Sequence, residues 1–246
     1  MLGAGYKASR HMRLVTWNCK MAAHKNKLDE LLRAFDPDVV VLPECASPDV
    51  VAARRVYAAA TSYAWAGGYA PKGLAVLTFK GATLAGVPRT AAGSAIAARV
   101  TCASLSFNLL GVWAKGEGLP AYVENVNAAL KQHDAFLRQG PSVVAGDLNS
   151  SATFDRQTRG GHTKLVAHLE SMGLVSAYNH HFNEEHGAEK RSTYFQHHKH
   201  KLTFHLDYIF RPREWGGFST VEVPEPAPWL KFSDHVPVVL DVSQQR

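Results

Sequence analysis

Short apolar runs alternate with amphipathic segments of helical period from Met12 onward, and this alternation constrains the fold more than any other feature. The run at 38–44, DVVVLPE, holds four consecutive apolar residues rich in valine, which is typical of a strand covered on both faces. The segment 24–35 before it places leucines on one helical face, and Asp36 and Pro37 end that helix. Strands that alternate with helices predict an α/β domain with buried sheets.

The same patterns predict the other elements of the chain. We expect further strands at 13–18, 73–79, 94–103, 105–113, 141–149, 192–195, 204–210, 218–223 and 236–242, and further helices over 47–60, 120–138 and 164–173. No internal repeat and no Ser/Gly-rich linker divides the sequence. Residues 12–246 are therefore expected to form a single domain.

Composition and charge exclude several classes of protein. No run reaches the ~18 to 20 apolar residues of a membrane-spanning helix, so a soluble, cytoplasmic protein is expected. The three cysteines, without a C-x-x-C pair, indicate neither a disulfide framework nor a thiolate zinc site. Residues 1–11 resemble a vector-derived leader; without Lys7 and Arg10 the net charge of +6 becomes +4. That mild excess is compatible with a nucleic-acid partner and does not establish one.

Polar side chains interrupt or follow several of the apolar runs. They are Asn18, Glu44, Asp147, Asn149, Asp207, Asp234 and His235. Carboxylates at the ends of buried strands lose solvation free energy unless a cation or a hydrogen-bond donor compensates them. Oxygen ligands without cysteine favour a hard ion, Mg²⁺ or Mn²⁺, over zinc. Each residue alone is more often a turn or a cap, and only their joint order makes a metal site the better interpretation.

Five motifs occur in a characteristic order: W-N, P-E, G-D-L-N, L-D-Y and S-D-H-x-P. In this order and over nearly the whole chain, from Met12 to Val242, the sequence resembles the endonuclease/exonuclease/phosphatase superfamily, which includes exonuclease III. The resemblance implies a four-layer αββα sandwich of two mixed β-sheets flanked by helices. It also implies an active site at one edge of the sheets.

The resemblance assigns a role to each motif residue. Asn18, Glu44 and Asp234 match metal-binding positions, with Glu44 as the principal carboxylate ligand. Asp147 matches the aspartate that orients or deprotonates the attacking water. Asn149 and His235 match residues that contact the phosphate, and Asp207 matches the carboxylate that orients the histidine.

One position departs from the family pattern. Where many members place a histidine or tyrosine after the strand at 105–113, this chain has Trp113, and the Tyr-x-Pro-Asn segment of the abasic-site endonucleases is absent. Tryptophan has one N–H donor and no acid chemistry. Trp113 either stacks on a base or sugar of the substrate or belongs to the core.

Substrate-binding residues are expected in the loops beside the motifs. The candidates are Lys72, Lys115, Arg156, Arg159, Lys164, Lys199 and Lys201 for a phosphate backbone, with Trp113 and Trp229 as walls of the cleft. A solvated surface position for each charge, and a core position for Trp229, are the alternatives. The region 179–201 holds six histidines, for which a solvated loop is a better interpretation than a metal site.

The leading hypothesis is a Mg²⁺- or Mn²⁺-dependent nuclease of the exonuclease III type that hydrolyses phosphodiester bonds in DNA, with no membrane and no protein partner implied. A phosphatase or phosphodiesterase for a small phosphorylated molecule or nucleotide is the second hypothesis. A non-catalytic nucleic-acid-binding module is the third, and so many ionisable groups at one sheet edge argue against it. Polarity of attack, strand preference and oligomeric state do not follow from the sequence.

Overall fold

A computed structural model describes residues 10–21, 27–86, 94–102, 105–198 and 201–244. Lys199, His200 and most of the expected leader lie outside the described residues. Arg10 and His11, the last two residues of the expected leader, form the beginning of the first strand.

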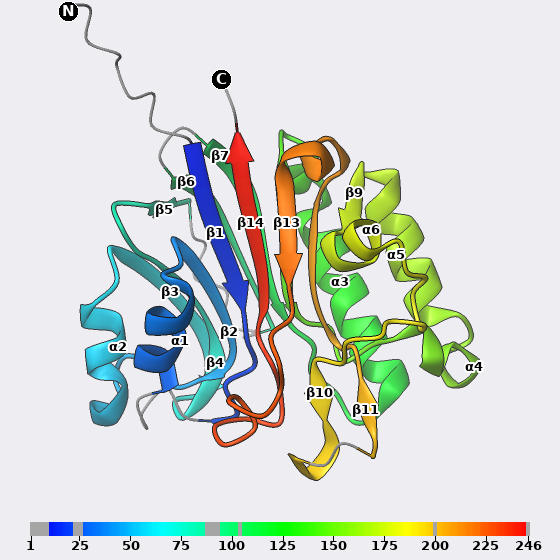
Figure 1. The fold of residues 1–246 in the computed structure, drawn as a ribbon, viewed down its shortest axis with the longest axis horizontal. Helices are drawn as coiled ribbons and strands as arrows, with labels where there is room; N and C mark the ends of the chain where they lie inside the picture. Colours follow the sequence, from blue (N-terminus) through cyan, green and yellow to red (C-terminus); the bar gives the residue numbers. More distant parts are fainter. Residues whose placement is uncertain (1–9, 22–26, 87–93, 103–104, 199–200, 245–246) are drawn as a thin grey trace, which may run out of the picture.

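Two six-stranded mixed sheets form the centre of the molecule (Figure 1). The first has the order β13 (Ser219–Glu222), β14 (Val238–Gln244), β1 (Arg10–Thr16), β2 (Val39–Cys45), β4 (Lys72–Thr78) and β3 (Ser62–Tyr69). The second has the order β5 (Thr83–Ala85), β6 (Ala95–Cys102), β7 (Leu105–Trp113), β8 (Ser142–Asp147), β12 (Asp207–Pro212) and β9 (Leu174–Ser176). Only β1–β2 and β7–β8 are parallel pairs. A small hairpin of β10 (Tyr194–Phe195) and β11 (Thr203–Phe204) projects below them.

Helices lie beside both sheets, as Figure 1 shows. They are α1 (Lys27–Phe35) and α2 (Arg54–Ala58) beside the first sheet, and α3 (Leu119–Leu137), α4 (Asp155–Thr158), α5 (Gly161–Ser171) and α6 (Ala177–Phe182) on the side of the second. The predicted α/β sandwich of two mixed sheets flanked by helices is confirmed. In the described part of the chain, no helix combines the length and the apolar composition that crossing a bilayer requires.

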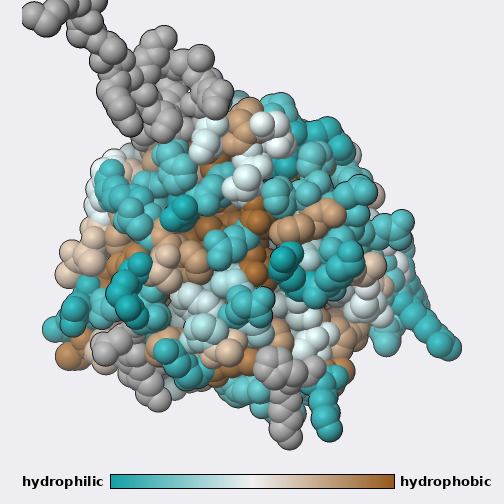
Figure 2. Space-filling view, viewed as in Figure 1, coloured by the Kyte–Doolittle hydropathy of each residue, from teal (hydrophilic) through white to brown (hydrophobic). Residues whose placement is uncertain are grey.

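Two apolar cores hold these layers together. The larger one includes residues of both sheets, such as Val41 and Leu109, together with Leu31 of α1. The smaller one lies between the second sheet and α3 and α5, where Leu130 and Leu165 are fully buried. Figure 2 shows mostly hydrophilic residues on one face of the molecule, with a strip of hydrophobic ones near its centre. Burial of these apolar side chains on both sides of each sheet explains why the strands read as continuous apolar runs.

Of the edge strands, β13 was expected at 218–223, but β3, β5 and β9 were missed by the sequence patterns. β5 and β9 have three residues each, too few for a period of two to stand out. β3 carries a glycine pair, and its Gly67 lies against the ring of Trp65, where a Cβ atom would come within 2.6 Å of the indole. The helix expected over 47–60 is shorter, because Ser47 Oγ accepts a bond from the backbone N–H of Asp49 in a local turn.

Candidate active site

The motif residues meet in one pocket of about 520 Å³ at the edge of the sandwich. Nine of the residues predicted from the sequence line it: Asn18, Glu44, Lys72, Trp113, Lys115, Asp147, Asn149, Asp234 and His235. Asn18 and Glu44 lie at the carboxyl ends of the parallel strands β1 and β2, which end on the same side. Asp147 ends β8, so strands of both sheets contribute to the pocket.

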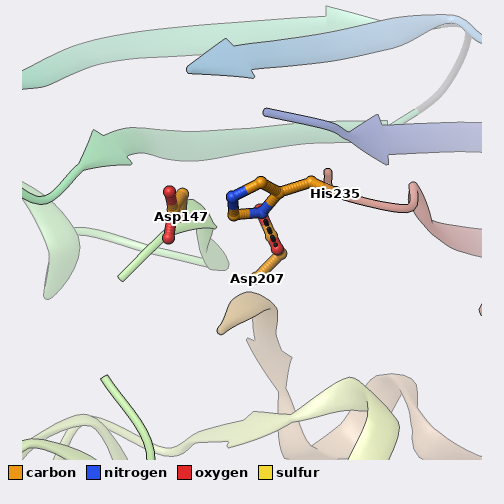
Figure 3. A group of neighbouring side chains, drawn as sticks. All are labelled: Asp147, Asp207 and His235. Carbon is orange, nitrogen blue, oxygen red and sulfur yellow. Dashed lines mark hydrogen bonds and ion pairs between the residues drawn. The ribbon is translucent and has the colours of Figure 1, made fainter. Parts of the chain in front are cut away.

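At the base of the pocket lies a buried group of two aspartates and a histidine (Figure 3). The Nδ1 atom of His235 lies 2.8 Å from Oδ2 of Asp207. Ligand atoms of Asp147, Asp207 and His235 all lie within 4.8 Å of one another, close enough for one ion to contact all three. Because the Nδ1–Asp207 contact occupies that ring nitrogen, only the opposite nitrogen of the imidazole is available for a substrate.

Strand register brings these three residues together. Asp207 and Asp147 face each other as paired residues of the antiparallel strands β12 and β8. His235 forms an isolated bridge with Tyr194, and the Tyr194 ring lies 4.8 Å from its imidazole. Oγ1 of Thr193 accepts hydrogen bonds from the backbone N–H groups of Leu206 and Asp207, which positions the start of β12.

The charges around His235 favour its protonated form. Burial by itself lowers the pKa of the imidazole, but the charge and hydrogen bond of Asp207, together with the charge of Asp147, raise it to about 9. At neutral pH the ring is therefore an imidazolium whose second N–H can donate to an anion.

The surroundings of Asp147 favour its neutral, protonated form. Complete burial and the nearby charge of Asp207 raise the pKa of its carboxyl group to about 7, although His235 opposes the shift. Oδ2 of Asp147 accepts hydrogen bonds from the amides of Asn18 at 2.8 Å and Asn149 at 3.1 Å. A carboxylate that titrates near neutrality suits a general base at physiological pH.

The oxygen-rich side of the pocket contains the predicted metal-binding residues. Nδ2 of Asn18 lies 3.3 Å from Oε1 of Glu44, so an amide and a carboxylate adjoin at the ends of β1 and β2. Lys72 pairs with Glu44 at 3.1 Å, and Lys20 pairs with Asp234 at 2.8 Å. Amide and carboxylate oxygens on one pocket wall are the donor set that a hard divalent cation prefers.

Local backbone geometry directs two of these side chains. Glu44 has a φ of 61°, and the register between β2 and β4 shifts around it, so a β-bulge turns its carboxylate into the pocket. Gly146, just before Asp147, has a φ of 146°, and a Cβ atom there would lie 1.8 Å from the carbonyl oxygen of Val112. Only glycine allows β7 and β8 to approach this closely beside Asp147.

Residues next to the predicted site residues form hydrogen bonds that connect the chain segments around the pocket. The indole N–H of Trp17 donates to the backbone oxygen of His235 at 2.9 Å. Oγ of Ser233 donates to the backbone oxygen of Asn18 and accepts from the N–H of His235. The bonds from Trp17 to His235 and from Ser233 to Asn18 join segments more than two hundred residues apart, which gives Trp17 and Ser233 a structural role in the W-N and S-D-H motifs.

Five predicted substrate-binding residues that the structure describes lie outside the pocket lining: Arg156, Arg159, Lys164, Lys201 and Trp229. Trp229 is 4% exposed, stacks on Phe35 and packs edge-on against Trp17, so the structure places it in the core. Arg156 belongs to α4, and Arg159 follows it in a left-handed conformation. Trp113 does line the pocket, although it is only 8% exposed.

Several lining residues were missed by the sequence analysis. They include Lys20, Met21, Tyr122 and Tyr194. Lys20 stands two residues after Asn18, and its place directly behind a strand end was a usable signal. No signal in the sequence marked Tyr122 or Tyr194, because the pattern of a helix or of a strand does not reveal which of its ends faces the pocket.

Comparisons with known proteins agree with this geometry. The family model described as Endonuclease/Exonuclease/phosphatase family matches residues 15–235. No curated protein sequence matches the chain significantly.

Solved structures share the fold at low sequence identity. An AP endonuclease, LMAP, from Leishmania major superposes with a TM-score of 0.71 at 14% identity, covering 96% of this chain and 89% of that one. A 3′-5′ exonuclease, NExo, from Neisseria meningitidis has a TM-score of 0.67 at 21% identity, covering 95% and 100%. The human Nocturnin catalytic domain has a TM-score of 0.67 at 17% identity, covering 96% and 94%.

Proposed function

Because the chain belongs to the endonuclease/exonuclease/phosphatase family, we propose that it hydrolyses phosphodiester bonds in DNA with a divalent cation, as an exonuclease III-type nuclease. The observation that carries the proposal is the buried group of Asp147, Asp207 and His235 beside the pocket. An anionic diester repels nucleophiles, so its hydrolysis needs a positioned water and donors for the charge that develops on oxygen.

The protein's own residues divide this work. Asp147, with a pKa near 7, orients the water and accepts its proton. The imidazolium of His235 and the amide of Asn149 donate hydrogen bonds to the non-bridging phosphate oxygens. Asp207 touches no reacting atom and acts through His235, whose ring it orients and keeps charged.

The donor set fits a divalent cation, Mg²⁺ or Mn²⁺. Glu44, Asn18 and Asp234 would hold it, since their oxygen-bearing side chains line one pocket. When bound, the cation supplies neutralising charge for the phosphate and the leaving oxygen. Lys72 and Lys20 would share Glu44 and Asp234 with the cation, because each lysine pairs with one of these acids.

Metal binding and cleavage test the proposal together. Labelled duplex, single-stranded and abasic-site DNA is incubated with the protein and Mg²⁺ or Mn²⁺, then with a chelator. We expect cleavage that the chelator abolishes. Glu44→Ala should weaken Mn²⁺ binding, measured by electron paramagnetic resonance, and lower the rate by at least ~10²-fold.

The matched control is Glu124→Ala, on the exposed surface of α3. Normal Mn²⁺ binding by Glu44→Ala would contradict the metal assignment, and a wild-type protein without Mn²⁺ binding would favour the binding module.

A small phosphoester is the second candidate substrate. It is favoured by the modest pocket volume and by Lys20, Lys72 and Lys115 around it. Salt separates the two candidates, because a polymer releases many counterions on binding and a small molecule releases few. A steep loss of DNA affinity with added salt, reduced in the double variant Arg156→Gln/Arg159→Gln, supports DNA. A shallow dependence with rapid turnover of a small diester supports the alternative.

A further inference from the structure

Lys115 differs from the other two lysines of the pocket. Lys20 and Lys72 each lie within salt-bridge distance of a carboxylate, Asp234 and Glu44 respectively. For Lys115, no carboxylate lies within that distance among the residues that the structure describes. Its ammonium group instead lies 4.4 Å from the centre of the Trp113 ring. Within the described part of the chain, the pocket therefore contains a cation that no carboxylate of the protein pairs with.

The segment that carries Lys115 is fixed to the catalytic strand. Trp113 is paired with Asp147 in the parallel ladder of β7 and β8. One residue later, the N–H of Ala114 donates to the backbone oxygen of Asp147 at 2.9 Å, and the amide of Asn149 reaches the Ala114 oxygen at 3.3 Å. The N–H of Lys115 donates to Oδ1 of an asparagine on α3 at 3.0 Å. These bonds fix the backbone of Lys115 relative to Asp147, and the contact with the Trp113 ring places the ammonium group.

The indole ring of Trp113 lies close to two ammonium groups. Lys72 also lies over its ring, 5.1 Å from the centroid, and the side chain is only 8% exposed. With two ammonium groups above it and almost no free face, the ring does not stack on a base of the substrate. It attracts the lysines through its negative face and thereby orients them.

Resting on the proposed function, we propose that Lys115 binds a second phosphate group of the substrate, one nucleotide from the phosphodiester that is cleaved. The preferred substrate thus carries a phosphate adjacent to the scissile one. Lys115 is the specificity-determining residue, and Trp113 is a positioning residue that acts through it.

The electrostatics of the site support an anion of this kind. Burial, and then the nearby charge of Lys72, lower the pKa of Lys115, so the ammonium is partly desolvated and repelled. A phosphate oxygen compensates both effects through a charge-assisted hydrogen bond. A neutral base or sugar compensates neither.

The second phosphate has two possible sources, an internal diester of a longer strand or a terminal monoester. Initial rates with TpT, pTpT, TpTp and TpTpT distinguish them. We expect kcat/KM for at least one substrate with two phosphates to exceed that for TpT by about tenfold. Preference for TpTpT identifies the internal diester, and preference for pTpT or TpTp identifies the monoester. Equal values for all four overturn the proposal, whereas cleavage of none of them counts against the proposed function instead.

Lys115→Met removes the charge but keeps the apolar stem. It should abolish the preference for two phosphates, so that the ratio of kcat/KM between the substrates with two phosphates and TpT falls to about one. The matched control is Lys131→Met, an exposed lysine of α3 outside the pocket, which should behave as wild type. A variant Lys115→Met that keeps the full preference overturns the proposal.

A binding measurement separates this inference from catalysis. Calorimetric titration without added metal compares thymidine 3′,5′-bisphosphate with thymidine 5′-monophosphate. We expect the bisphosphate to bind more tightly to the wild type by about tenfold and the two to bind equally to Lys115→Met. Identical binding of both ligands to the wild type overturns the assignment even if diesters are cleaved.

The positioning role of Trp113 needs its own readout. Trp113→Phe keeps an aromatic face for the ammonium and should retain most of the preference. Trp113→Leu should lose it to the extent that Lys115→Met does, with kcat for TpT less affected than the ratio between substrates. If Phe and Leu variants have the same preference, Trp113 does not position Lys115.

Discussion

Two buried polar clusters begin one residue apart at the end of β8, and their histidines have opposite charge states. Asn149 turns toward the pocket, where His235 contacts a carboxylate and has its pKa raised to about 9. Ser150 turns the other way, and its Oγ lies 3.0 Å from Nδ1 of His162. There, burial and then the neighbouring His186 lower the pKa of His162 to about 3.

The difference lies in the partners and not in the depth of burial. His162 is fully buried and His235 is 5% exposed, so both imidazoles are desolvated. Nε2 of His162 lies 3.0 Å from another imidazole, His186, whereas Nδ1 of His235 lies 2.8 Å from Asp207. A buried histidine is charged only where an acid compensates the lost solvation. We assign the charged cluster to the reaction and the neutral one to packing.

The largest expected effect comes from replacing the two histidines. His235→Ala removes a phosphate donor and should lower turnover by at least ~10²-fold with the fold retained. His162→Ala should leave turnover within about threefold, because its cluster faces away from the pocket. It should lower the free energy of unfolding by about 1–3 kcal/mol, since Ser150 and His186 lose a partner.

Steady-state rates and denaturant unfolding of both variants check this contrast. Circular dichroism establishes that each variant is folded. A large loss of turnover in His162→Ala at full folding would show that the second cluster also takes part in the reaction.

Asp207→Asn tests why the first histidine is charged. The amide keeps the shape but not the charge, so the pKa of His235 should fall below its wild-type value of about 9. Turnover should fall by about tenfold through misorientation of the ring and loss of its charge. NMR titration of the His235 ring in metal-free protein measures the shift. An unchanged pKa would mean that another group keeps the ring protonated.

The two clusters should give opposite dependences of stability on pH. The folded-state pKa of His235, about 9, lies above its ordinary value of 6.5, so its contribution is present below 6.5 and lost as the pH rises toward 9. The folded-state pKa of His162, about 3, lies below 6.5, so its contribution is present above 6.5 and lost as the pH falls toward 3. Each slope approaches ~1.4 kcal/mol per pH unit.

Unfolding free energies of wild type and two variants isolate these slopes. Asp207→Asn should reduce the loss of stability between about pH 7 and 9, and His162→Gln should reduce the loss between about pH 6.5 and 5. If both variants kept the wild-type dependence of the unfolding free energy on pH, the charge states assigned to the two histidines would be wrong.

The smallest expected effect concerns the residue at which the clusters part. Ser150→Ala removes the hydroxyl that contacts His162 and should lower the free energy of unfolding by about 1 kcal/mol. Turnover should stay within about twofold, because Asn149 keeps its bonds to Asp147 and Ala114. A tenfold loss of turnover, measured under the conditions used for wild type, would show that the two clusters are coupled.

The layers and the pocket were predictable from the sequence to different degrees. Buried strands such as β2 and β8 read clearly, because sheets covered on both faces demand continuous apolar residues. The edge strand β3 did not, since the Trp65 indole of β3 packs against Gly73 of the neighbouring strand β4, and the sequence does not show this tertiary contact. Trp229 shows the same limit, because its proximity to His235 in sequence indicates the cleft while its stacking on Phe35 places it in the core.

By itself, the sequence determined which groups are the candidates for the chemistry. The order of the five motifs gave the family resemblance that predicts roles for Glu44, Asp147 and His235, and each of these residues adjoins or lies in an apolar run of a predicted strand. Only the tertiary structure decided which of these groups is charged, and which lysine of the pocket lacks an acid. Desolvation and Coulomb energies depend on distances through space, and the neighbours that set them come from segments far apart along the chain.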